Sequence, residues 1–141
     1  MAKLTEEMKK ELIRQAWQGA EKSYSPYSNF KVGAAVLAST GEIYRGCNIE
    51  NVSYGITNCA ERTAIFKMVS EGCTSFTAIC VAAGDTALMS SPCGACRQVM
   101  AEFCADMDTP VVLAGKDGSV YDTTVGALLP DAFLRTNLIH E

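Results

Sequence analysis

Residues 77–114 read TAICVAAGDTALMSSPCGACRQVMAEFCADMDTPVVLA, and this stretch decides the class of fold. Its first part, Thr77–Ala83, is an apolar run typical of a buried strand. The segment from Pro92 to about Cys104 has the pattern of a helix, and Pro110–Ala114 is a second apolar strand. A strand, a helix and a strand in succession indicate a sheet that is covered by helices.

The flanking sequence supplies the other predicted elements. A helix is indicated from Thr5, its N-cap, to about Glu21, because apolar residues recur at every fourth position from Met8 to Ala20. Further elements are predicted at Phe30–Ala38 (strand), Ile43–Ile49 (strand), Cys59 to about Glu71 (helix), Val120–Thr124 (strand) and within Val125–Phe133 (a short helix, interrupted at Pro130), with loops at Glu50–Asn58 and Gly84–Ser91. The resulting order, αββαβαββα, argues for one mixed sheet covered by helices.

Composition narrows the class of protein. A chain of 141 residues, nearly half of them apolar, suits a single domain that spans residues 1–141. The net charge of −4 and the scattered basic residues disfavour a nucleic-acid partner. No apolar run approaches the roughly 20 residues of a membrane span, and the polar N-terminus does not resemble a secretory signal. We therefore expect a cytoplasmic protein without a membrane partner. Its seven cysteines are an odd number, which disfavours a fully paired disulfide framework, and in a reducing compartment clustered cysteines are more typical of metal ligands or catalytic groups.

Two short motifs contain the candidate metal ligands and catalytic residue: Cys59-Ala60-Glu61 and Pro92-Cys93-Gly94-Ala95-Cys96. Zinc prefers thiolate ligands in a tetrahedron, and a catalytic zinc keeps one position open. The sequence therefore predicts one zinc ion bound by Cys59, Cys93 and Cys96.

Both motifs lie at predicted helix starts. Asn58 is the predicted N-cap of the first of these helices. Ser91 is the predicted N-cap of the second, with Pro92 at the first helical position. The positive end of a helix dipole lowers cysteine pKa values and favours thiolates. Arg62 and Arg97 follow the ligands closely, so both are candidates to donate hydrogen bonds to the sulfurs.

Two other readings of the cysteines remain open. The C-x-x-C pair alone could be a redox dithiol, although no thioredoxin-like strand precedes it. A structural zinc would need a fourth protein ligand. The candidates for it are Cys47, Cys73, Cys80, Cys104 and His140.

Glu61 also has two interpretations. With Asn58 as N-cap it would stand at the N3 position of a capping box. Beside a zinc ligand, a carboxylate can instead move a proton between water and a substrate, and this is the interpretation that we favour.

Longer stretches of the sequence resemble the small cytidine deaminases that act on free nucleosides. These stretches cover nearly the whole chain: SPYSNFKVGAA (25–35), NIEN (48–51), NCAER (58–62) and SPCGACRQ (91–98). Zinc-dependent nucleobase deaminases share the pattern of a ligand, any residue and Glu, followed by Pro-Cys-x-x-Cys.

The resemblance implies a three-layer α/β/α sandwich with a five-stranded mixed sheet, a homotetramer with shared active sites, and one zinc ion per subunit. It implies hydrolytic deamination of cytidine and deoxycytidine to uridine and deoxyuridine in pyrimidine salvage, with release of ammonia. The residues that it assigns to substrate binding are Asn48 and Glu50 (ribose), Phe30 (base wall), Ala60 and Ser91 (base edge, through the backbone) and Phe133 (reaching a neighbouring subunit's site).

The residues themselves make some of these roles chemically reasonable. On a strand, Asn48 and Glu50 would share one face, and an amide with a carboxylate suits a hydroxyl group that both donates and accepts. A solvated strand end is the alternative for this pair. Phe30 alone would more often be core, and Tyr54 could line the pocket or pack in its loop.

Three rival functions follow from the same motifs: deamination of another cytosine nucleoside such as an aminonucleoside antibiotic, editing of a polynucleotide, and a zinc-stabilised structural module. The acidic balance disfavours the second. The preference between cytidine and deoxycytidine stays open, because neither sugar contact needs a 2′-hydroxyl group.

Overall fold

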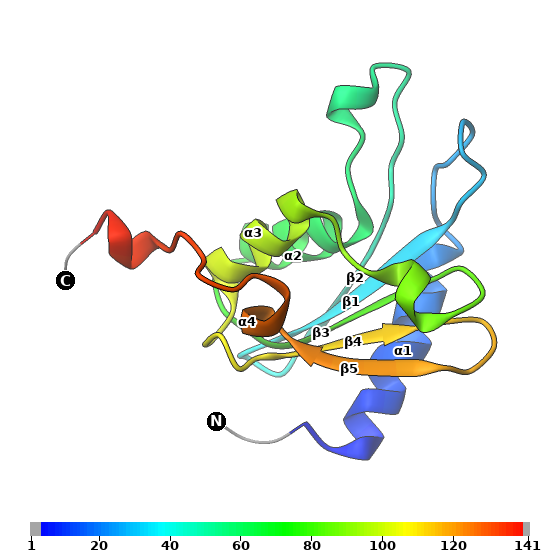
Figure 1. The fold of residues 1–141 in the computed structure, drawn as a ribbon. Coiled ribbons are helices and arrows are strands. Elements are labelled where there is room, and N and C mark those ends of the chain that lie inside the picture. Colours follow the sequence, from blue (N-terminus) through cyan, green and yellow to red (C-terminus); the bar gives the residue numbers. More distant parts are fainter. Residues whose placement is uncertain (1–3, 140–141) are drawn as a thin grey trace.

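The computed structural model describes residues 4–139, which form a five-stranded sheet with helices on both of its faces (Figure 1). The helices and strands, in chain order, are α1 (Glu6–Ala20), β1 (Val32–Ala38), β2 (Ile43–Cys47), α2 (Ala60–Ser70), β3 (Phe76–Ala83), α3 (Gly94–Phe103), β4 (Pro110–Ala114), β5 (Val120–Thr124) and α4 (Val125–Leu128). The predicted order of elements is confirmed. Within this part of the chain, no helix has the length and apolar composition of a membrane span.

The sheet is mixed, as predicted. Its strands lie in the order β2-β1-β3-β4-β5. Only β3 and β4 are parallel, and α3 connects them; the other neighbours pair antiparallel. The strand–helix–strand stretch is thus the centre of the fold, with the β1–β2 hairpin beside β3 and the single strand β5 beside β4.

Helix α1 covers one face of the sheet. The Thr5 hydroxyl accepts the Met8 N–H at 3.1 Å, which confirms the predicted N-cap. The buried stripe of α1, which includes Leu12 and Ala16, packs on small side chains of the central strands such as Ala78 and Cys80. Because these side chains are small, the helix lies close to the sheet.

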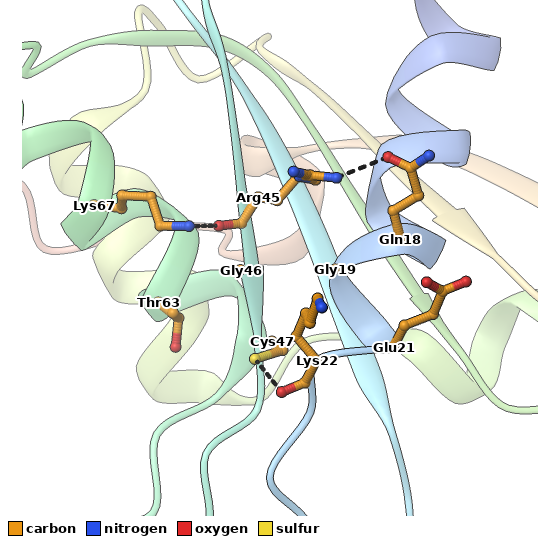
Figure 2. Close-up of a pocket in the computed structure, with 9 residues that line it drawn as sticks. All are labelled: Gln18, Gly19, Glu21, Lys22, Arg45, Gly46, Cys47, Thr63 and Lys67. Carbon is orange, nitrogen blue, oxygen red and sulfur yellow. Dashed lines mark hydrogen bonds between the residues drawn. The ribbon is translucent and has the colours of Figure 1, made fainter.

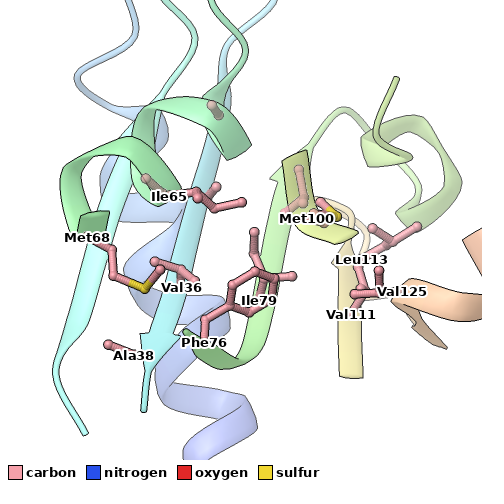
Figure 3. Packing of buried hydrophobic residues seen from close by; sticks show 14 of the residues in the cluster. Val36, Ala38, Ile65, Met68, Phe76, Ile79, Met100, Val111, Leu113 and Val125 are labelled. Carbon is pink, nitrogen blue, oxygen red and sulfur yellow. The ribbon is translucent and has the colours of Figure 1, made fainter. Parts of the chain in front are cut away.

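Helices α2 and α3 cover the opposite face, and the larger side chains of the core lie there (Figure 3). Ile65 and Met68 of α2, Phe76 of β3 and Met100 of α3 are fully buried in this layer. Two helical layers around one sheet give the expected three-layer α/β/α arrangement.

Two predicted strands are too long. The first begins at Val32 instead of Phe30, because Asn29 has a left-handed φ of 58° and the Phe30 N–H donates to the Ser28 hydroxyl at 3.0 Å. The turn therefore continues through Phe30. The second ends at Cys47, so Asn48 and Glu50 lie beyond it and not on one strand face as predicted.

Candidate metal centre and active site

Three cysteines meet at the N-terminal ends of α2 and α3. The sulfur atoms of Cys59, Cys93 and Cys96 all lie within 4.8 Å of one another. The Cys59 and Cys93 sulfurs are 3.8 Å apart. A tetrahedral zinc site with metal–sulfur distances of about 2.3 Å places two sulfurs about 3.8 Å apart. The donor set and its spacing therefore fit a zinc ion.

The cysteines occupy the N-cap positions that were predicted for other residues. Cys59, not Asn58, is the N-cap of α2, and Cys93, not Ser91, is the N-cap of α3. Asn58 donates instead to the Thr63 hydroxyl at 3.0 Å, and Pro92 precedes the helix. Each of these two sulfurs thus lies directly at a helix N-terminus, where the backbone N–H groups favour a thiolate.

Within residues 4–139, the cluster has these three members only. The other cysteines that were candidates for a fourth ligand lie elsewhere. Cys80 is fully buried in the core beneath α1. The remaining three donate to backbone carbonyls: Cys47 to Lys22, Cys73 to Ser75 and Cys104 to Ala101. His140 lies outside the described residues. A three-ligand arrangement is the one that leaves a position open.

The two arginines behave differently. The Arg62 guanidinium donates to the Cys59 sulfur at 3.3 Å, as predicted. Hydrogen bonds from Cys96 and from Arg62 lower the pKa of the Cys59 thiol to about 5, while burial opposes them. The prediction for Arg97 is wrong: its guanidinium donates to the Pro92 and Leu128 carbonyls and to the Ser91 hydroxyl.

Glu61 lies beside the cluster but is not one of its members. It is 4% exposed and stands at the second helical position of α2, because the helix begins one residue later than predicted. A capping box needs the third position, so this alternative does not apply. Burial raises the pKa of the Glu61 carboxyl to about 7, so it can hold or release a proton near neutral pH.

A cavity of about 200 Å³ opens in front of these groups. It contains Cys59, Glu61 and Cys93 together with four of the predicted substrate-binding residues: Phe30, Asn48, Ala60 and Ser91. Phe30 is 38% exposed, so it is a pocket wall and not core. The pocket is also lined by Val32, Ala83, Met89 and Ser90, which the sequence analysis missed.

Asn48 is held in place by three hydrogen bonds. Its side-chain oxygen accepts from Ser23 (2.5 Å) and from the Val32 N–H (3.0 Å). Its side-chain nitrogen donates to the Phe30 carbonyl at 2.8 Å. An amide nitrogen has two N–H groups, so one donor is left for a ligand.

Glu50 lines a neighbouring hollow with Tyr27, Ser28 and Tyr54. Its carboxylate accepts from the Tyr27 and Ser28 N–H groups and from the Ser28 hydroxyl. These hydrogen bonds lower the pKa of the Glu50 carboxyl and keep it ionised, and the bond from the Ser28 hydroxyl has the largest effect. A carboxylate can accept about four hydrogen bonds, so one acceptor site remains.

Phe133 lies outside the pocket. It is 60% exposed on the segment after α4, and its carbonyl accepts from Gln98 at 2.8 Å. In Figure 1 this C-terminal segment extends away from the sheet.

A second cavity, of about 340 Å³, lies between α1, β2 and α2 (Figure 2). It is larger than the pocket at the cysteines. Its lining includes the charged groups of Lys22, Arg45 and Lys67, but neither Glu61 nor any of the three clustered cysteines. The chemistry therefore belongs to the smaller cavity.

Comparisons with known proteins agree with this geometry. Residues 6–113 match the family described as the cytidine and deoxycytidylate deaminase zinc-binding region. The chain is 55% identical over 127 residues to a cytidine deaminase of Sporosarcina psychrophila, covering 90% of this chain and 92% of that protein. It is 56% identical over 122 residues to one of Halalkalibacterium halodurans, covering 86% and 91%. The crystal structure of cytidine deaminase from Burkholderia pseudomallei superposes with a TM-score of 0.81 at 48% identity, covering 88% of this chain and 98% of that one.

Proposed function

The chain belongs to the cytidine and deoxycytidylate deaminase family, and we propose that Cys59, Cys93 and Cys96 bind its zinc ion while Glu61 moves the protons of the reaction. The reaction is the zinc-dependent hydrolytic deamination of cytidine. Deoxycytidine is the second proposed substrate, and uridine, deoxyuridine and ammonia are the products. The observation that supports this site best is the 3.8 Å spacing of the Cys59 and Cys93 sulfurs, which matches a zinc tetrahedron, in a cavity that also contains Glu61.

The base is read by groups that complement the edge of cytosine. The Ala60 N–H belongs to the first turn of α2, where backbone donors have no partner within the helix, and it donates to the O2 carbonyl. The Ser91 N–H already donates to Leu88 at 3.2 Å. Ser91 therefore offers its carbonyl, which accepts from the 4-amino group. Phe30 is the wall against which the base packs.

The ribose hydroxyl group is bound by the second N–H of the Asn48 amide, which donates, and by the unused acceptor site of the Glu50 carboxylate. Such a pair suits a hydroxyl group that gives one hydrogen bond and accepts another. This favours an ordinary nucleoside over an aminonucleoside antibiotic.

Zinc bound at the three thiolates supplies Lewis-acid activation of water. Glu61 takes a proton from the attacking water and delivers it to N3 as the C4–oxygen bond forms. It then passes the second water proton to the amino group, the C4–nitrogen bond breaks, and ammonia leaves.

The assembly that we propose is a homotetramer with shared sites. Val52, Tyr54 and Ile56 are 76%, 75% and 68% exposed on the loop after β2, and such apolar groups are typical of a surface that contacts partner copies. Phe133 is the residue proposed to reach a neighbouring subunit's site. We further propose that residues 1–141 act as one domain in the cytoplasm, in pyrimidine salvage. None of the seven cysteines forms a disulfide, which fits the reducing conditions of that compartment.

The turnover of both nucleosides tests the function. The ultraviolet absorbance change of cytosine to uracil is followed for cytidine and for deoxycytidine, before and after zinc chelation. We expect turnover that disappears on chelation and returns with added zinc. Full zinc occupancy without turnover of either nucleoside would instead support the structural-module alternative.

Replacing Arg62 by alanine should weaken zinc binding by about tenfold, because the sulfur loses its charged hydrogen-bond donor. Competition with a chelating dye measures this affinity. Arg45→Ala, which removes an exposed guanidinium beside the cavity of Figure 2, is the control and should bind zinc like the parent protein. Wild-type zinc affinity and turnover in Arg62→Ala would rule out this role.

A further inference from the structure

Arg97 makes three hydrogen bonds with one guanidinium, and together they fix one wall of the active-site pocket. Its Nε donates to the Pro92 carbonyl at 2.8 Å, and one terminal nitrogen donates to the Ser91 hydroxyl at 3.0 Å. The other terminal nitrogen donates to the Leu128 carbonyl at 2.9 Å. The backbone around Ser91 is thereby attached both to α3 and to the end of α4.

The Ser91–Pro92 segment needs such an attachment. Pro92 has no N–H, so it cannot anchor itself by donating to the α3 region or to the sheet. Ser91 follows a short 3-10 turn, Ala87–Ser90, and precedes α3, so it lies between elements and not within one. The Ser91 N–H donates to the Leu88 carbonyl, and Arg97 donates to the Ser91 hydroxyl and to the Pro92 carbonyl.

The neighbouring residue extends this connection. Gln98 donates to the Phe133 carbonyl at 2.8 Å, so the same turn of α3 holds both the pocket wall and the C-terminal segment. Only a guanidinium has the rigid, planar set of donors that can reach three acceptors in different directions. A lysine ammonium is a single point and cannot span them.

We propose that Arg97 is a positioning residue for base recognition, which holds the Ser91 carbonyl where it accepts from the amino group of the substrate. The inference rests on the proposed function, in which Ser91 reads that amino group. Arg97 itself does not line the pocket, so it acts through Ser91 and Pro92.

The test compares Arg97→Lys with the parent enzyme. The KM for cytidine should rise about tenfold, as expected for the loss of a charge-assisted hydrogen bond that orders the acceptor. The value of kcat should change less than about threefold, because Glu61 and the three cysteines keep their places. Zinc should stay at one ion per chain, measured by elemental analysis.

Uridine supplies the readout that a general structural defect would not give. It has an oxygen in place of the amino group, so it cannot donate to the Ser91 carbonyl. Its inhibition constant should therefore change less than about twofold in Arg97→Lys. Arg14→Lys, which alters an exposed guanidinium paired with Glu11 on α1, is the control and should match the parent enzyme in every readout.

Ser91→Ala is the second variant, and it tests the positioning role of Arg97 if Arg97→Lys does not fold. It removes only the hydroxyl that accepts from Arg97, and the KM for cytidine should rise about threefold. An unchanged KM in the folded variants, equal losses for cytidine and uridine, or loss of zinc would overturn the inference. An inactive parent enzyme would overturn the proposed function, and the inference with it.

Discussion

Glu61→Gln is expected to lower kcat for cytidine by about a thousandfold while one zinc ion per chain stays bound. Glutamine has nearly the shape of glutamate but cannot take or deliver a proton, and general acid–base catalysis by one group contributes about 10²–10⁴-fold. Glu61 is not a member of the cysteine cluster, so its replacement leaves the ligand set intact. Steady-state kinetics and elemental analysis of the same sample measure both quantities.

Glu102→Gln is the matched control, since it makes the same change at an exposed position of α3. It should retain wild-type kcat. If the Glu61→Gln enzyme had the kcat of the parent enzyme, the assignment of Glu61 as the proton carrier would be wrong. Loss of zinc from that variant would show instead that the carboxylate helps to hold the metal.

Cys96→Ala should abolish zinc binding and lower turnover by at least about a thousandfold, because Lewis-acid activation supplies several kcal/mol to the transition state. The Cys96 side chain is fully buried, so no outside group can replace the lost sulfur. Zinc content per chain, measured by elemental analysis after dialysis, checks the first effect, and cytidine turnover checks the second.

Cys80→Ala controls for the loss of any buried thiol. Cys80 is also fully buried, but it packs under α1 on the other face of the sheet. This variant should keep one zinc ion per chain and full turnover. If Cys96→Ala also kept its zinc, the three-cysteine site would be wrong.

The sequence was informative wherever the signal is local. Apolar runs and their turn residues predicted the strands from Thr77 onward, and Gly41 and Gly118 take the left-handed φ values expected in the two hairpin turns. Each strand is short and continuous, so its place is read from neighbouring residues alone. The three cysteines were found in the same way, from spacing in two motifs.

The starts of α2 and α3 were predicted one and two residues too early, and the reason is physical. Asn58 and Ser91 are better N-cap residues than cysteine by side-chain chemistry. The structure uses Cys59 and Cys93 there instead, without any side-chain cap hydrogen bond. The proposed role of these two cysteines as zinc ligands accounts for this exception, because a functional requirement can override a local capping preference.

Contacts between distant segments could not be predicted. The Asn48 amide is held by Ser23, Phe30 and Val32, which come from the turn before β1 and from the start of β1. Arg97 reaches Leu128, 31 residues away, whereas proximity in sequence had suggested the sulfurs. Such partners depend on how the elements pack, and no spacing rule contains that information.

X-ray absorption at the zinc edge, on the protein loaded with zinc, tests the central claim most directly. The three-cysteine catalytic site predicts one zinc ion per chain with three sulfur neighbours at about 2.3 Å and one oxygen or nitrogen neighbour at about 2.0 Å. A shell of four sulfurs would mean a closed structural site. The absence of sulfur neighbours would mean that Cys59, Cys93 and Cys96 do not bind the metal.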